Sequence, residues 1–331
     1  MIVSIIAPMY NEENIIERTF GELQQEMTKH PELDYEILFI NDGSTDDSLK
    51  IARQLSERSP KLKIFSYDRN QGRGKALRTG FENAKGDILV TVDFDLSYSA
   101  EHIGHMLNVL LNDPSVDVVL TSAYMPGGRT LGVPKTRLAL SKIGNLIYRL
   151  AFSPPIFTST CIVRAYRKEA IKYLNLSEND KEIHLEIISK LLANSFIIKE
   201  IPGTLTKREG GKSKFRFRRT SLKHLIYFFH EKPFIIFGFL GSMFLLLGFL
   251  SGLIIVYSRF SGDIEFTKTY IGRIASPNFV ILNFLFGFQF IGLGFLGAQN
   301  SIIKRELFRL QKQIEYNFSN NSKGEKDTHT Y

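Results

Sequence analysis

The sequence predicts an α/β domain followed by two membrane-spanning helices, and three observations support this prediction. Short apolar runs alternate with amphipathic stretches over residues 1–120, and two long runs near the C-terminus contain no charged residue. The formal net charge of +8 is also unevenly distributed. Residues 1–206 hold 24 Lys and Arg against 26 Asp and Glu, whereas residues 207–331 hold 18 against 8. The excess of cations belongs to the C-terminal part, so binding to nucleic acid is not needed to explain it.

The predicted elements alternate along the first part of the chain. Strands are expected at five apolar runs, which are Val3–Ala7, Glu36–Ile40, Lys63–Tyr67, Ile88–Val92 and Val116–Thr121. Helices are expected at the four amphipathic stretches between them, which are Glu13–Thr28, Asp46–Ser56, Lys75–Asn83 and Glu101–Leu111. This alternation favours a mostly parallel sheet with helices on both faces. Ligands of such sheets bind at the carboxyl ends of the strands.

Composition excludes several classes of protein. Of the 331 residues, 23% are charged and 12% are aromatic, which excludes a disordered or collagen-like chain. A single cysteine, Cys161, excludes a disulfide scaffold and a CxxC metal site.

The two uncharged runs extend from Pro233 to Ser258 and from Ile274 to Ile303. Each exceeds the roughly 20 apolar residues that cross a bilayer. We therefore expect a hairpin over residues 233–303, with helices at about 234–257 and 279–301. The alternative is a pair of buried helices in a soluble domain. Glycines in both runs suit close helix packing within one chain or between two, which leaves a homo-oligomer open.

Basic residues flank this hairpin. Nine Lys and Arg lie between Lys207 and Lys232, four lie between Lys304 and Lys312, and only three lie in the connecting loop. The positive-inside rule then predicts that both termini and residues 1–206 are cytoplasmic. Residues 207–232 are expected to form a basic phosphate-binding loop and an amphipathic helix on anionic headgroups, or else a solvated basic helix. Residues 304–331 are expected to form a basic cytosolic tail, disordered from Asn320.

A polar motif follows each of the first four predicted strands. These motifs are APMYNEEN (Ala7–Asn14), INDGSTDDS (Ile40–Ser48), RNQGRGKALRTG (Arg69–Gly80) and DFD (Asp93–Asp95). Each motif alone is weak evidence, and the glycine run lacks the GxxxxGK[ST] pattern of a P-loop. Four of them in one order at successive strand ends are far more specific.

With these motifs the sequence resembles the family 2 glycosyltransferases, and within them the dolichyl- and polyprenyl-phosphate sugar synthases. Further matching stretches are YMPGG (Tyr124–Gly128), VRAYRKEAI (Val163–Ile171) and REGGKSK (Arg208–Lys214). The resemblance implies a GT-A (Rossmann-like) nucleotide-sugar-binding domain, an inverting mechanism, and Mg²⁺ or Mn²⁺ as cofactor. Some members of this family carry C-terminal membrane helices.

The resemblance also implies a donor site. The nucleotide-sugar would contact Pro8, Tyr10, Asn11, Glu12, Asp42, Gly72, Asp93, Phe94, Asp95, Arg208 and Lys214. Asp93, Asp95 and Arg208 would be the catalytic residues. Two carboxylates at i, i+2 after a strand offer the hard oxygen ligands that a divalent metal ion requires, although such a pair can also cap a helix. Arg208 and Lys214 would close over the diphosphate, or would simply attract anionic lipid.

An acceptor site is predicted at Arg137, Ser141 and Asn145, which recur every four residues on one face of a helix. By resemblance this face would hold the lipid phosphate; the alternative is a solvated polar stripe. Three residues depart from the pattern of the family. Ser97 replaces a common Gln near the metal, Ala123 replaces an Arg, and Thr158 replaces an Asp proposed elsewhere as a base.

The leading hypothesis is an inverting transfer of a hexose from a GDP- or UDP-sugar to a polyprenyl or dolichyl phosphate at the cytosolic membrane face. A family 2 enzyme with another acceptor, such as a glycolipid or polysaccharide, is the alternative. The chain contains no Trp and so lacks the QxxRW motif of processive synthases. A catalytically dead membrane scaffold of the same fold is the alternative outside enzymes.

Overall fold

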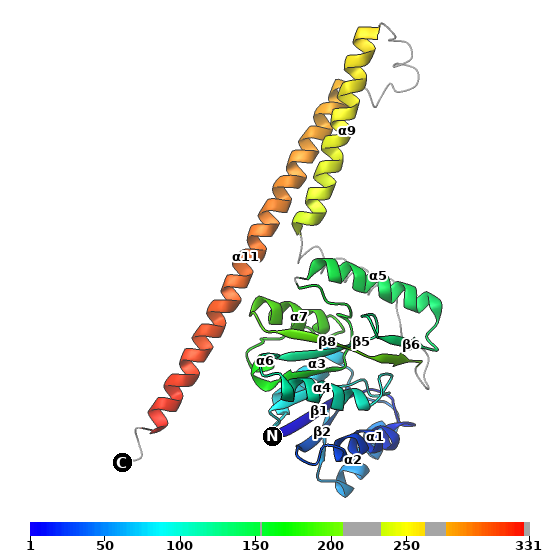
Figure 1. The fold of residues 1–331 in the computed structure, drawn as a ribbon, viewed down its shortest axis with the longest axis vertical. Helices are drawn as coiled ribbons and strands as arrows, with labels where there is room; N and C mark the ends of the chain where they lie inside the picture. The colour runs from blue at the N-terminus through cyan, green and yellow to red at the C-terminus, as the bar shows by residue number, and fades with distance from the viewer. Residues whose placement is uncertain (153, 208–232, 262–275, 328–331) are drawn as a thin grey trace. The chain divides into compact units, whose positions relative to one another are not determined.

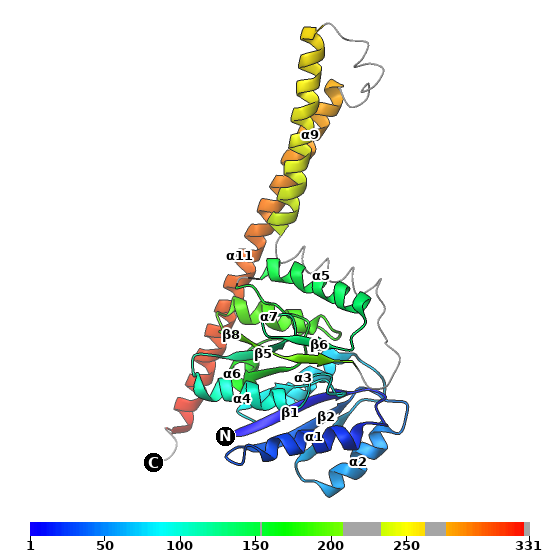
Figure 2. The same ribbon diagram turned by 45° about the vertical axis from the view of Figure 1, so that its right-hand side comes forward.

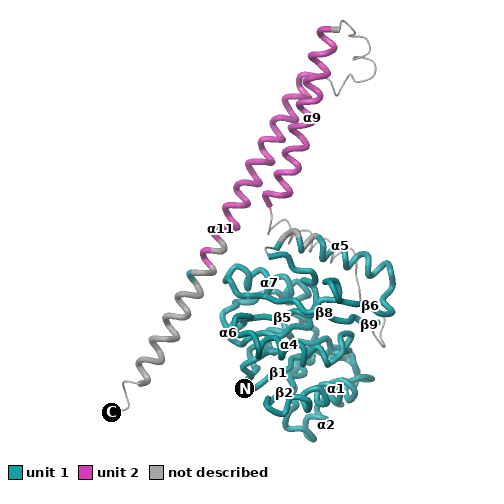
Figure 3. Tube along the Cα trace, in the orientation of Figure 1, with its two compact units in different colours: residues 1–217, 308–331 teal, residues 218–307 magenta. Residues whose placement is uncertain are grey.

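The computed structural model describes residues 1–152, 154–207, 233–261 and 276–327. Contacts divide the chain into two units (Figure 3). Unit 1 comprises Met1–Phe217 and Phe308–Tyr331, and unit 2 comprises Arg218–Leu307.

A seven-stranded sheet forms the centre of unit 1, in the order β3-β2-β1-β4-β7-β5-β8 (Figure 1). Strands β1 to β4 are mutually parallel, β5 pairs in parallel with β8, and β7 is antiparallel to both of its neighbours. The strands are β1 (Ile2–Met9), β2 (Asp34–Asn41), β3 (Leu62–Ser66), β4 (Ile88–Thr91), β5 (Val118–Ser122), β7 (Arg164–Arg167) and β8 (Ile198–Pro202). All five predicted strands are present, so the prediction of an α/β sheet is confirmed.

Helices alternate with these strands, and the four predicted helices are found. They are α1 (Ile16–Thr28), α2 (Ser48–Arg58), α3 (Arg73–Asn83) and α4 (Glu101–Asn112). The second half adds α5 (Lys135–Ala151), α6 (Lys168–Lys172), α7 (Ile183–Ala193) and a small sheet of β6 (Arg129–Leu131) and β9 (Thr204–Thr206). In two views α5 lies at the opposite end of the unit from α1 and α2, with the large sheet between them (Figures 1 and 2).

Strand β1 lies inside the core. Val3, Ile5, Ile6 and Ala7 are fully buried, as expected for a parallel strand whose two faces are both covered. Helix α3 approaches this strand closely at Gly80, where a Cβ atom would lie 2.3 Å from Cγ2 of Ile6. The unbroken apolar run therefore places the motif after β1 at the end of a rigid, central strand.

Strand β7 was not predicted, and it separates β4 from β5 in the sheet. Its first residue, Arg164, is fully buried. The guanidinium donates hydrogen bonds to the carbonyl oxygens of Ser159 (2.6 Å), Cys161 (2.7 Å) and His184 (3.1 Å). These bonds fasten the loop before β7 to the first turn of α7.

Unit 2 contains two helices long and apolar enough to cross a membrane, spanning Pro233–Phe260 in α9 (Pro233–Ser261) and Pro277–Ile303 in α11 (Pro277–Asp327). The predicted close approach of glycines occurs here within one chain. A Cβ atom on Gly241 would lie 2.8 Å from the carbonyl oxygen of Gly287. Backbones this close match the small-residue packing of membrane helices.

Two predictions concern the ends of this unit. Helix α11 continues to Asp327, which differs from the predicted disordered tail after Asn320. A helix that has already formed in the apolar span extends at low cost, because nucleation is its expensive step. The predicted phosphate-binding loop and juxtamembrane helix, at residues 208–232, lie outside the described residues.

Candidate functional site

The loop after β1 is bonded to the loop after β2. Asn11 has a left-handed backbone (φ 55°), and its N–H donates to Oγ of Ser44 (2.9 Å). Its side-chain oxygen accepts the N–H of Thr45 (2.8 Å), and the N–H of Glu12 donates to Oγ of Ser48 (2.8 Å). Two of the predicted donor motifs are thereby held side by side. Pro8, Tyr10, Asn11 and Glu12 are all half-buried, which leaves part of each side chain open to a ligand.

Asp42 joins the second loop to the third. Its carboxylate accepts the backbone N–H groups of Gln71 (2.7 Å) and Gly72 (3.0 Å), and only 4% of the residue is exposed. Burial raises the pKa of this carboxyl, although the two hydrogen bonds oppose that shift. The family resemblance assigned Asp42 to the nucleotide base, and that assignment stays a prediction. In this structure both carboxylate oxygens hold the loop that leads into α3.

Gly72 and Gly74 lie against the segment that precedes α7. Gly72 has a φ of 98°, and a Cβ atom there would lie 2.3 Å from the carbonyl oxygen of Asn179. A Cβ atom on Gly74 would lie 2.4 Å from the carbonyl oxygen of Glu178. Only glycine permits this approach, so the predicted donor residue Gly72 has a packing function in addition to any contact with substrate.

Asp93 and Asp95 follow β4 in a tight turn. Oδ1 of Asp93 lies 3.5 Å from Nη1 of Arg73, and Oδ1 of Asp95 accepts the N–H of Ser97 (3.1 Å). Leu96, which lies between Asp95 and Ser97, adopts a left-handed backbone (φ 48°) although it is a buried leucine. Strained residues of this kind cluster at functional sites. The ring of Phe94, predicted at the donor site, packs in the core against Phe39 with ring centroids 4.8 Å apart.

Strand β9 is hydrogen-bonded to the end of this turn. The N–H and the hydroxyl of Thr206 both donate to the carbonyl oxygen of Ser97, at 2.8 and 3.0 Å. Thr206 lies directly before the predicted phosphate-binding segment. Arg208 and Lys214, the predicted diphosphate contacts in that segment, lie outside the described residues.

The turn fits a divalent metal ion in its donor chemistry. Asp93 and Asp95 are both half-buried, so two carboxylates reach solvent at the carboxyl end of β4. Hard cations such as Mg²⁺ are commonly held by one or two carboxylates together with substrate phosphates and water. Among the residues that the structure describes, no group of three His, Cys, Asp or Glu could hold a metal ion alone. The remaining ligands would have to come from a diphosphate and water.

The predicted acceptor residues lie on α5 as expected, but their surroundings differ. Arg137 is exposed. Ser141 accepts a hydrogen bond from the Tyr124 hydroxyl (2.8 Å), and burial raises the pKa of that phenol. Asn145 is 3% exposed and donates to the carbonyl oxygen of Ser141 (2.9 Å), and its Oδ1 accepts the N–H of Ser159 (2.9 Å). Asn145 thus joins α5 to the loop before β7, whereas Arg137 and Ser141 retain ligand-binding capacity.

Of the three positions that depart from the family pattern, Ser97 is half-buried beside Asp95, and the other two are buried. Ala123 is 5% exposed and Thr158 is 3% exposed. The hydroxyls of Thr158 and Ser122 are 2.6 Å apart. Glu200, which sequence reasoning missed, accepts the N–H groups of Phe157 (2.8 Å) and Thr158 (2.9 Å). Its carboxylate holds the loop in place.

Two cations were also missed. Arg73 was quoted within a motif but received no role, and the structure pairs it with Asp93. Lys181 stands just before α7, and burial, followed by the charge of Arg73, lowers the pKa of its ammonium. Lys181 belongs to no motif, so the local sequence holds no signal that could have identified it.

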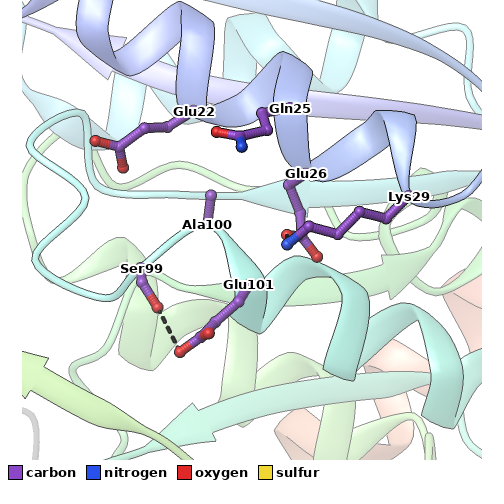
Figure 4. Close-up of a pocket in the computed structure, with 7 residues that line it drawn as sticks. All are labelled: Glu22, Gln25, Glu26, Lys29, Ser99, Ala100 and Glu101. Carbon is purple, nitrogen blue, oxygen red and sulfur yellow. Dashed lines mark hydrogen bonds and ion pairs between the residues drawn. The ribbon is translucent and has the colours of Figure 1, made fainter.

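An open pocket of about 360 Å³ lies elsewhere in unit 1, between α1 and α4 (Figure 4). Its lining residues are Glu22, Gln25, Glu26, Lys29, Ser99, Ala100 and Glu101. The Glu26 carboxylate is already paired with Lys29 (2.6 Å). None of the predicted site residues lines this pocket, so it does not mark the candidate site.

Comparisons with known proteins find similarity to glycosyltransferases. Residues 4–174 match glycosyl transferase family 2. The polyprenol monophosphomannose synthase of Mycolicibacterium smegmatis is 30% identical over 63% of this chain and 79% of its own length. The dolichol-phosphate mannosyltransferase of Pyrococcus furiosus is 30% identical over 65% of this chain and 60% of its own length.

A third relative also covers the apolar helices. The undecaprenyl-phosphate 4-deoxy-4-formamido-L-arabinose transferase of Photorhabdus laumondii is 26% identical over 98% of this chain and 97% of its own length. Among solved structures, Mycobacterium tuberculosis glucosyl-3-phosphoglycerate synthase with Mn²⁺, UDP-glucose and phosphoglyceric acid has a TM-score of 0.50 at 17% identity. That match covers 68% of this chain and 79% of the other. It shows the fold, which is the predicted GT-A type.

Proposed function

The chain belongs to glycosyl transferase family 2, and from that premise we propose that it transfers a hexose from a GDP- or UDP-sugar to a polyprenyl phosphate at a membrane surface. One combination of features supports the choice of acceptor. The chain joins the turn of Asp93 and Asp95 to two apolar helices, and a relative that matches over both parts is an undecaprenyl-phosphate sugar transferase. Anchoring beside a bilayer raises the encounter rate with a lipid substrate.

The donor would bind at the ends of β1 to β4. Tyr10, Glu12 and the loop held by Asp42 would surround the nucleoside, and Asp93 and Asp95 would hold Mg²⁺ or Mn²⁺ at the diphosphate. A bound divalent ion would neutralise charge that develops on the departing nucleoside diphosphate. Arg73 would bind the diphosphate from the start of α3, where the helix N-terminus also favours an anion.

The transfer itself would need no general base. The second pKa of a phosphomonoester is near 6, so the acceptor oxygen is already an anion at neutral pH. That oxygen would attack the anomeric carbon, the bond from carbon to the nucleoside diphosphate would break, and the configuration would invert to a β-linked product. The neutral hydroxyl of Thr158, at a position where the family resemblance implies Asp, agrees with this account. Catalysis would then consist of positioning and charge neutralisation.

The orientation of the chain completes the proposal. Residues 1–206 and both termini would lie on the cytoplasmic side, with the basic flanks of the two helices next to anionic headgroups. Residues 207–232 would supply Arg208 and Lys214 to the diphosphate.

The direct test is a transfer assay with membranes that contain the full chain. Radiolabelled UDP- and GDP-sugars are offered with undecaprenyl or dolichyl phosphate, and the lipid extract is analysed. We expect label in a lipid-phosphate sugar that mild acid cleaves, with one nucleotide strongly preferred. Label in a glycolipid or polysaccharide would favour the alternative acceptor class. No transfer from any donor, with the protein intact in the membrane, would favour a scaffold and contradict the proposal.

A further inference from the structure

Thr19 is a buried threonine near the start of α1. Only 2% of the residue is exposed. A threonine inside a helix commonly donates its hydroxyl to a carbonyl oxygen three or four residues earlier, and Thr28 of the same helix does so toward Gln25 (2.7 Å). The Thr19 hydroxyl instead donates to the carbonyl oxygen of Phe94 (2.8 Å). It therefore joins α1 to a segment 75 residues further along the chain.

Phe94 is the residue between the two carboxylates of the predicted metal site, Asp93 and Asp95. Only 4% of it is exposed, and its ring packs against Phe39 of β2 with ring centroids 4.8 Å apart. The ring contact fixes its side chain, and the bond from Thr19 fixes its carbonyl group. Both restraints act on the short piece of backbone that links one carboxylate to the other.

Other carbonyl groups of the turn at residues 93–97, the metal turn, are also hydrogen-bonded. The carbonyl oxygen of Asp93 accepts the N–H of Leu96 (3.0 Å), and that of Ser97 accepts the N–H and the hydroxyl of Thr206. The left-handed backbone of Leu96 is costly for a residue with a side chain, and it persists only where the surroundings enforce it. Thr19 supplies that support from α1, and Thr206 supplies it from β9.

Loss of the Thr19 hydroxyl would deprive a buried carbonyl oxygen of this donor. A buried acceptor without its donor keeps the full cost of its removal from water, so other arrangements of the turn would become competitive. The separation of the Asp93 and Asp95 carboxylates would differ in those arrangements. Metal binding would then include the cost of restoring the separation, which lowers the affinity.

We propose that Thr19 is a positioning residue for the divalent metal ion at Asp93 and Asp95. This inference rests on the proposed function and deepens it. The hydroxyl would not contact the ion. It would fix the backbone between the two carboxylates, so that they are arranged before the metal ion and the diphosphate arrive. Because α1 begins directly after the motif that follows β1, the same helix would link the nucleoside loop to the metal turn.

The test compares Thr19→Val, which keeps the shape and removes the hydroxyl, with Thr19→Ser, which keeps the hydroxyl. Thr28→Val is the matched control, because it removes an exposed hydroxyl from the same helix. Full-length protein in detergent is titrated with Mn²⁺ in the presence of UDP or GDP, and free Mn²⁺ is measured by electron paramagnetic resonance. We expect Thr19→Val to weaken Mn²⁺ binding about fivefold or more, the size expected for loss of one buried hydrogen bond. Thr19→Ser should recover most of the affinity, and Thr28→Val should stay within about twofold of wild type.

The transfer assay supplies the second readout. In Thr19→Val the Mn²⁺ concentration for half-maximal transfer should rise by the same factor, while the KM for polyprenyl phosphate stays within about twofold. An unchanged Mn²⁺ affinity in Thr19→Val, whatever its thermal stability, would overturn the proposal and leave Thr19 with a packing role only. A weakening that Thr19→Ser does not recover would also overturn it, because the methyl group would then carry the effect. A wild-type chain that binds Mn²⁺ as expected but transfers no sugar would instead contradict the proposed function.

Discussion

The donor side of the candidate site consists of the loops after β1 to β4, and the acceptor side consists of α5, the loop at residues 157–160 and the start of α7. On both sides, side-chain oxygens accept backbone N–H groups of another segment, as Asp42 does on the donor side and Asn145 and Glu200 do on the acceptor side. The two sides differ in what carries these side chains. Asp42 directly follows β2, an inner strand of the sheet, whereas Glu200 lies on the edge strand β8 and Asn145 lies on α5. In the proposed function, the part that would handle the diphosphate is therefore anchored inside the sheet, and the part that would select the acceptor is anchored at its edge and on a separate helix.

The largest effect should come from the metal turn on the donor side. We expect Asp95→Asn to lower transfer about a thousandfold, because the variant loses a charged ligand where the leaving diphosphate gains charge. Radiolabelled transfer in membranes measures the loss. Glu57→Gln, which neutralises an exposed carboxylate on α2, serves as the control. Activity within tenfold of wild type for Asp95→Asn would refute the importance of this side for catalysis.

A second change tests how tightly the two sides are packed together. Gly72→Ala places a Cβ atom against Asn179 at a φ of 98°, and we expect it to cost about 2–4 kcal/mol of unfolding free energy. Chemical denaturation of the full chain in detergent measures this. Gly21→Ala in α1 is the control, since its Cβ meets nothing within 4 Å and should stabilise by up to about 1 kcal/mol. Equal stabilities for the two variants would show that the contact with Asn179 is dispensable.

We expect the acceptor side to lose more stability against unfolding at low pH than the donor side does. His184 in α7 is 2% exposed, and burial, followed by the charge of Arg164, holds its pKa well below the usual value. The unfolded chain therefore binds a proton below about pH 6.5 that the folded chain does not, so stability falls as pH falls. The loss should begin near pH 6.5 and grow as the pH falls, by at most about 1.4 kcal/mol for each pH unit.

Unfolding measured at about pH 6.5 and about pH 5 for His184→Leu should show a smaller loss than for wild type. His105→Leu, at an exposed position on α4, is the matched control. The same acid dependence in His184→Leu and wild type would exclude His184 as its source.

The smallest effect is expected at Thr158. Thr158→Ala removes a hydroxyl that pairs with Ser122, which should cost about 1 kcal/mol of stability. Because the acceptor oxygen is already ionised, transfer should fall only a few-fold, as measured in the same radiolabel assay. A loss near a thousandfold in a variant that still folds would mean that this position takes part in proton transfer after all.

Sequence reasoning succeeded where the relevant contacts are local. Asp93 and Asp95 follow an apolar run that is indeed a strand, and the spacing of Arg137, Ser141 and Asn145 predicted the helix that is observed. The four helices between the first five strands were predictable for the same reason, since amphipathic spacing depends on neighbours in the chain.

Sequence reasoning missed contacts with distant segments. Gly72 was predicted as a donor contact by resemblance, and its packing against Asn179, a residue far along the chain, had no signal in the sequence. Strand β7 was not predicted, and it begins with Arg164, a charged residue whose burial depends on two carbonyl groups of the preceding loop and one in α7.

The strand order β3-β2-β1-β4-β7-β5-β8 has a consequence for synthesis on the ribosome. The first four strands are neighbours in the sheet and emerge first, so the nucleotide-binding half can assemble while translation continues. Strand β5 has no partner at that stage, because β7 must enter between it and β4. We expect nascent chains halted before residue 160 to protect the amides of β1 to β4 from hydrogen exchange while those of β5 still exchange. In each newly made molecule, the donor half of the site would thus form before the acceptor half.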